Sequence, residues 1–131
     1  MRKKAYAALN ALGSPEAELS IVFVDDDEIA VLNRQYLNRK GTTNVIAFPM
    51  REGAYSEISP LLLGDVVISV DTAAREGKQA GMAMETRLEE LLIHGILHLF
   101  GYEHETNPED ARQMENKYLE LIHLTRALQK E

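Results

Sequence analysis

Three short runs of β-branched and apolar residues alternate with longer segments of helical pattern, and this alternation constrains the fold more than any other feature. The runs cover residues 19–24, 44–48 and 65–70. Runs of this length and composition are typical of buried strands. Strands separated by helices predict a small mixed β-sheet covered by helices, which is an α+β layer fold.

The helical segments have recognisable start and stop residues. Asp25 and Glu28 have capping-box spacing, Asp71 can cap the helix after the third strand, and Gly101 is a C-terminal stop. Asn107 followed by proline suits the start of the last helix. The expected helices cover about residues 2–12, 26–36, 71–81, 87–100 and 107–129, and residues 51–60 are expected to form a loop.

The composition limits the kinds of site that the chain can build. Its 131 residues are enough for one domain with its own core. There is no cysteine, so any metal must be bound by histidine, aspartate or glutamate. No apolar run approaches the roughly 20 residues of a membrane span, and no signal-peptide pattern precedes the first helix. We therefore expect a cytoplasmic protein without a membrane partner.

The charge is unevenly distributed along the chain. The net charge of −7 argues against a general binder of polyanions. Residues 1–51 carry seven basic and six acidic side chains, whereas residues 52–131 carry seven and fifteen. The acidic part is expected to form solvated helix faces. A local basic strip remains possible, formed by Arg34, Arg39, Lys40 and Arg51.

Three of the four histidines fall within the eleven residues HGILHLFGYEH, which run from His94 to His104. His94 and His98 are four residues apart, so both imidazoles project from one face of the predicted helix. Gly101 lets the chain turn, so that His104 can return toward the pair. Three neutral imidazoles with one open coordination position are typical of catalytic zinc, although iron, nickel or copper could use the same nitrogens.

The spacing also matches HExxHxxGxxH, the zinc motif of metzincin proteases. In those enzymes the glutamate after the first histidine is the general base, and here that position is Gly95. Peptide hydrolysis by that mechanism is therefore disfavoured. Glu103 or Glu105 could supply a carboxylate, either to catalysis or as a fourth ligand of a structural zinc ion, and either could equally be a solvated turn residue.

At the level of motifs, HGILHLFGYEH is similar to HGxLHLxGYDH, the signature of the YbeY family. Members of that family are bacterial single-strand-specific endoribonucleases that act in rRNA maturation and ribosome quality control. Further matches occur in the same order along residues 19–125. They are Leu32-Asn33 with Tyr36, the segment 43–49, which resembles TNVLSFP, and the segment 64–69, which resembles GDIVIS.

The resemblance implies a single metal-dependent hydrolase domain over residues 1–131, with a metalloprotease-like zinc site on a central helix and the turn after it. It implies one zinc ion per chain, bound by His94, His98 and His104. It also implies a cytoplasmic enzyme that acts on single-stranded RNA in 16S rRNA 3′-end maturation, with ribosomal RNA and the ribosome as partners and no DNA.

One departure concerns the arginine that follows the tyrosine of the family's LNxxYR stretch and contacts the RNA phosphate. The corresponding residue here is Leu37, so the contact is expected to shift to Arg39 or Arg34 as the catalytic cation, unless both are plain surface residues. Two alternatives therefore stay open, namely a ribosome-associated assembly factor with a largely structural zinc ion and a metallohydrolase of another substrate.

Three further residues have two readings each. Asn44 either faces the active-site cleft or closes the turn before its strand. Phe48 and Tyr102 either stack on RNA bases or belong to the core.

Overall fold

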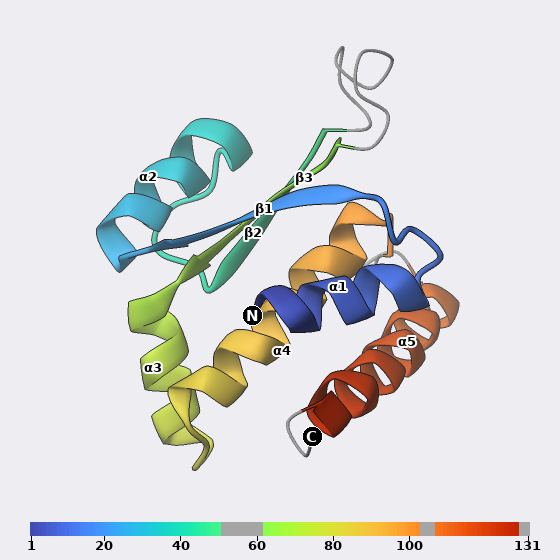
Figure 1. The fold of residues 1–131 in the computed structure, drawn as a ribbon. Helices are drawn as coiled ribbons and strands as arrows, with labels where there is room; N and C mark the ends of the chain where they lie inside the picture. Colours follow the sequence, from blue (N-terminus) through green and yellow to red (C-terminus); the bar gives the residue numbers. More distant parts are fainter. Residues whose placement is uncertain (51–61, 103–106, 129–131) are drawn as a thin grey trace.

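The computed structural model describes residues 1–50, 62–102 and 107–128, and it folds them into a three-stranded sheet and five helices (Figure 1). The predicted α+β class, a small mixed sheet covered by helices, is confirmed. The loop predicted over residues 51–60 lies outside the described residues.

The sheet contains β1 (Glu18–Val24), β3 (Leu62–Ser69) and β2 (Val45–Pro49), in that spatial order. β1 and β3 are parallel, while β2 is antiparallel to β3. The carboxyl ends of β1 and β3 therefore meet the beginning of β2 at one edge of the sheet. Residues that follow β1 and β3, or precede β2, are brought together at this edge.

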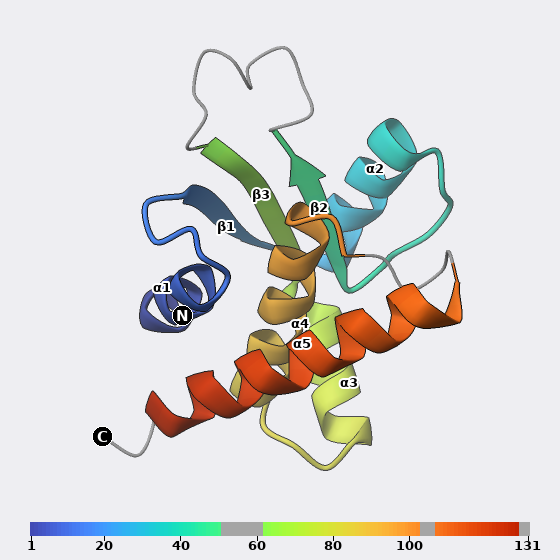
Figure 2. The ribbon, with the colours of Figure 1, turned by 90° about the vertical axis from the view of Figure 1, so that its right-hand side faces the viewer.

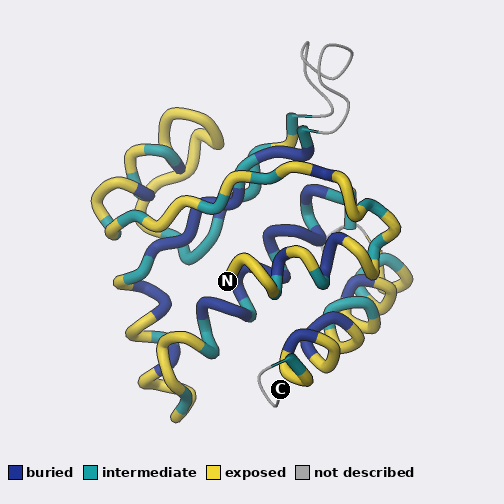
Figure 3. Tube along the Cα trace, in the orientation of Figure 1, coloured by how far each residue is buried: buried dark blue, intermediate teal, exposed yellow. Residues whose placement is uncertain are grey.

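The helices cover both faces of the sheet (Figures 1 and 2). α2 packs on one face through Ile29, which contacts Ile46 and Val67. On the other face, Val66 and Ile68 join the main core, to which the other helices contribute. Figure 3 shows α4, in the middle of that core, as largely buried. The helices are α1 (Arg2–Ala11), α2 (Asp26–Leu37), α3 (Val70–Gln79), α4 (Met84–Leu99) and α5 (Pro108–Ala127).

Two helix starts differ from the predictions. α3 is capped by Ser69, whose hydroxyl accepts from the backbone N–H of Thr72 at 3.2 Å, rather than by Asp71. The apolar run continues into the first residue of the helix, which hid this boundary from a pattern-based prediction. α4 begins at Met84 rather than at residue 87.

Three predicted helix signals are confirmed. Asp25 and Glu28 form a reciprocal capping box at the start of α2. The Asn107 side chain accepts from the N–H of Asp110 at the start of α5. Gly101 has a φ of 90° just after the end of α4, a conformation that glycine adopts at little cost.

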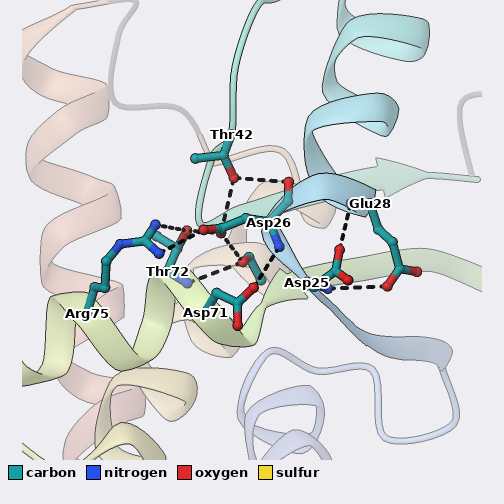
Figure 4. Close-up of polar contacts among 8 residues, drawn as sticks. Asp25, Asp26, Glu28, Thr42, Asp71, Thr72 and Arg75 are labelled. Carbon is teal, nitrogen blue, oxygen red and sulfur yellow. Dashed lines mark hydrogen bonds and ion pairs between the residues drawn. The ribbon is translucent and has the colours of Figure 1, made fainter.

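A polar cluster at the meeting edge of the strands fixes α2 against α3 (Figure 4). The Asp26 carboxylate accepts hydrogen bonds from Ser69 Oγ and Thr72 Oγ1, both at 2.6 Å, and from Arg75 Nη1 at 2.7 Å. Asp71 accepts from the backbone N–H of Asp26 at 3.0 Å. The Arg75 guanidinium and the two hydroxyls hold the pKa of Asp26 well below its usual range. The cluster sets the direction in which α3 leaves the sheet.

A buried carboxylate joins three of the helices. Glu89 on α4 is 1% exposed and accepts from Lys4 Nζ at 2.8 Å and from Thr125 Oγ1 at 2.5 Å. These partners lie on α1 and α5, so the carboxylate ties both helices to the central one. α4 is apolar and has 16 residues. In the described part of the chain, no helix is long and apolar enough to cross a membrane.

Candidate metal centre

The two histidines of α4 lie on the half-buried side of a helix segment, residues 88–99, that is otherwise buried. Between Leu88 and Leu99, the half-buried residues are Glu90, His94 and His98, and all the others are buried. The interval of four residues puts these three side chains on one stripe of the helix. We refer to this stripe, with Arg87 one turn before it, as the open stripe of α4.

The open stripe faces a pocket of about 300 Å³ between α4 and the start of β2. Asn44 lies in its wall, as the cleft reading predicts. Its backbone carbonyl also accepts a hydrogen bond from Ser69 N at 2.9 Å, so Asn44 connects the start of β2 to the end of β3 as well. The lining residues are Asn44, Val45, Ala47, Arg87, Leu91, His94, Gly95 and His98. The helix and strand thus bring two imidazoles, an amide and a guanidinium to one hollow.

Gly95 allows α4 to lie close to the sheet beside this pocket. A Cβ at this position would lie 2.6 Å from Val66 Cγ1 and 3.4 Å from Val45 Cγ2. Both valines belong to strands on which α4 packs. A glutamate at this position, as in the metzincin motif, would therefore collide with the sheet. The site lacks the protease base because its position is used for packing.

The imidazole of His94 is stacked on Tyr118, a residue of α5. The ring centroids are 4.3 Å apart and the interplanar angle is 19°. Burial and the negative charge of Glu90 raise the pKa of Tyr118 to about 12, so the phenol is neutral at physiological pH. The stack restricts the orientation of the imidazole plane. No local pattern predicts this contact, because Tyr118 is distant in sequence and lies on another helix.

The predicted third ligand, His104, lies outside the described residues, as do Glu103 and Glu105. Among the residues that are described, no group of three histidine, cysteine or acidic side chains could hold a metal ion. His94 and His98 nevertheless fit zinc, because their imidazoles lie one turn apart on the wall of one pocket. The turn at Gly101 follows directly, so the chain changes direction where the third ligand was predicted to return.

Arg87 is a member of the site that sequence reasoning missed. Its Nε donates to Glu76 Oε1 at 3.0 Å and its Nη1 to Glu90 Oε1 at 2.8 Å. Glu76 also accepts from Asn44 Nδ2 at 3.2 Å, which links the pocket wall to α3. Arg87 precedes His94 by seven residues, which is two helical turns. This spacing places Arg87 on the same face of the helix as His94, so Arg87 could have been predicted from the sequence.

The two arginines predicted from the sequence lie elsewhere. Arg34 is on α2 and Arg39 follows that helix, and both side chains are exposed. α2 covers the face of the sheet opposite to α4, so neither arginine lines the histidine pocket. Leu37, the last residue of α2, is 41% exposed. Arg51 of the predicted basic strip lies outside the described residues.

The two aromatic candidates pack against the protein. Phe48 makes an edge contact with Tyr36 on the α2 side of the sheet, with ring centroids 5.6 Å apart. Tyr102 packs against the main core. Neither aromatic ring therefore forms an open stacking platform for RNA bases beside the histidines.

Known proteins resemble the chain over nearly its whole length. Residues 2–125 match the family model described as endoribonuclease YbeY. Endoribonuclease YbeY of Geobacter metallireducens is 49% identical over 123 residues, which cover 93% of this chain and 82% of that protein. The same enzyme of Syntrophotalea carbinolica is 51% identical with the same coverage. The solution structure of a Thermotoga maritima protein is similar, with a TM-score of 0.69, 25% identity, and coverage of 98% of this chain and 81% of that one.

Proposed function

The chain belongs to the YbeY family of endoribonucleases, and we propose that it cleaves single-stranded RNA with one zinc ion held by His94, His98 and His104. The observation that carries this proposal is the open stripe of α4. A helix that is otherwise buried leaves two imidazoles, one turn apart, on the wall of a pocket. The absence of a base at Gly95 favours RNA over peptides as the substrate.

Each described residue of the pocket has its own proposed role. His94 and His98 would bind the metal through imidazole nitrogens, and the stack on Tyr118 orients the first of these rings. When bound, zinc supplies a Lewis acid and activates water near neutral pH. Asn44 presents a polar amide at the wall of the pocket that also holds the two imidazoles.

The biological setting follows from the family. We expect the substrate to be ribosomal RNA, with 16S rRNA 3′-end maturation and ribosome quality control as the processes, the ribosome as the partner and the cytoplasm as the location. Arg34 and Arg39 are proposed to contact RNA phosphates on the α2 side of the molecule. They are exposed there, and with Lys40 they form a short basic stretch in a chain whose net charge is −7.

A second candidate function is supported by Leu37. An exposed leucine at the position of the family arginine removes one cation from the predicted RNA path. A ribosome-associated assembly factor with a largely structural zinc ion would tolerate that loss. The two functions differ in whether the purified protein cuts RNA.

The experiment that tests the proposal measures cleavage of a labelled single-stranded RNA together with the zinc content of each preparation. Wild type, a chelator-treated sample and His98→Ala are compared. His123→Ala is the matched control, because His123 is exposed on α5 and outside the histidine pocket. Loss of cutting after chelation and in His98→Ala, with cutting retained in His123→Ala, supports the proposal. One zinc ion per chain without any cutting would instead support the assembly factor.

A further inference from the structure

Arg87 shares the open stripe of α4 and the pocket with both histidines. It precedes His94 by seven residues, so the two Cα atoms are separated by about 10 Å along the helix axis. A long arginine side chain spans much of that separation. The guanidinium side chain is 22% exposed, so it is neither sealed in the core nor free on the surface.

Two carboxylates hold the guanidinium in one orientation. Nε and Nη2 of Arg87 lie 3.0 Å from Glu76 Oε1, and Nη1 lies 2.8 Å from Glu90 Oε1. Burial alone would lower the pKa of Arg87, but the hydrogen bonds to Glu90 and Glu76 outweigh it, and the pKa is raised above its usual value. The side chain therefore stays charged, and little conformational freedom is left to be lost when a ligand binds.

The contacts with the carboxylates do not use every donor of the guanidinium. Arginine has five N–H groups in a planar fork. Nε donates to Glu76 and Nη1 donates to Glu90, while Nη2 lies within ion-pair distance of Glu76. Each terminal nitrogen therefore keeps at least one N–H outside these contacts, and Arg87 lines the histidine pocket. Two donors of one guanidinium can contact oxygens of a phosphate group.

We propose that Arg87 binds a backbone phosphate of RNA at the mouth of the histidine pocket. This inference rests on the proposed endoribonuclease function and adds a substrate-binding residue to it. It also gives this chain, which has Leu37 in place of the family arginine, a cation at the histidine pocket that is supplied by α4. Glu76 and Glu90 hold the guanidinium in place, and both its charge and its directed hydrogen bonds contribute to the contact.

The competing explanation is that Arg87 only joins α3 to α4. A matched control separates the two explanations, because Arg126 also contacts Glu90, at 3.5 Å, but lies outside the histidine pocket. Removing either arginine disturbs the same carboxylate. Only the loss of Arg87 removes donors from the pocket.

The test compares wild type, Arg87→Gln, Arg87→Lys and Arg126→Gln. Affinity for a single-stranded RNA is measured on chelated protein at several salt concentrations, and kcat and KM are measured on zinc-loaded protein. Melting temperature and zinc content are recorded for each. For Arg87→Gln we expect roughly tenfold weaker RNA binding, a higher KM, and a salt slope smaller by about 0.7. Arg87→Lys should restore the slope but only part of the affinity, since it keeps the charge and loses the fork.

Each outcome has a definite meaning. Equal RNA affinity in Arg87→Gln and wild type, or equal losses in Arg87→Gln and Arg126→Gln, would overturn the inference while leaving the endoribonuclease function intact. If wild type neither binds nor cuts RNA, the proposed function fails and the inference fails with it. Should Arg87→Gln not fold, Arg87→Lys decides the matter: it must retain the salt slope and lose affinity, and unchanged affinity would refute phosphate binding by the fork.

Discussion

Replacing Gly95 with alanine tests how closely α4 lies on the sheet. The added Cβ would lie 2.6 Å from Val66 Cγ1, whereas carbon atoms in contact are separated by about 3.5 Å. One of the two elements must therefore move by about 0.9 Å. Val66 is fully buried and β-branched, so its side chain cannot rotate away cheaply.

The magnitude follows from two opposing effects. Overpacking of a core costs about 1–3 kcal/mol. Alanine in place of glycine gains about 1 kcal/mol of helix propensity. Gly95→Ala is therefore expected to lower the free energy of unfolding by about 0–2 kcal/mol. The helix shift should also weaken zinc binding, since both neighbouring histidines move with it.

A double-mutant cycle with Val66→Ala isolates the clash. In the Val66→Ala background both Cγ atoms are absent, so the propensity gain remains and Gly95→Ala should become neutral or stabilising. The coupling free energy is expected to be about 1 kcal/mol or more. Urea unfolding followed by far-UV circular dichroism measures each variant, with a chelator present so that metal binding does not contribute. A Gly95→Ala protein more stable than wild type, with coupling below about 0.5 kcal/mol, would refute the close approach.

Three further predictions concern other contacts. Tyr118→Leu should weaken zinc binding roughly tenfold by releasing His94, whereas Tyr118→Phe should bind as wild type does, and a zinc titration against a chromophoric chelator distinguishes them. The folded-state pKa of Asp26 lies below its ordinary value of 3.8, so its stabilisation is complete above that pH and is lost as the pH falls. Asp26→Asn should therefore be less stable than wild type at neutral pH, and the difference should shrink in acid unfolding curves. Lys4→Met leaves the buried carboxylate of Glu89 without its cation and should cost about 2–3 kcal/mol in urea unfolding, with part recovered by adding Glu89→Gln.

Local features of the sequence were sufficient for most of the secondary structure. Each strand run and each helix pattern corresponds to an element, because side-chain periodicity and capping act over a few residues. The errors occur where two local signals overlap. Val70, at the end of an apolar run, was predicted to be part of a strand, but it is the first residue of α3, which the Ser69 hydroxyl caps.

The sequence by itself also determined that His94 and His98 share a helix face, since this depends only on a spacing of four residues. Which cation accompanies them was decided by the tertiary structure. Arg34 and Arg39 are on the α2 side of the sheet, and Arg87 enters the pocket because α4 packs on the other face. The stack of Tyr118 on His94 was likewise decided by the crossing of α5 over α4. Contacts of this kind depend on which faces of distant elements meet, and the packing of the whole core fixes that choice.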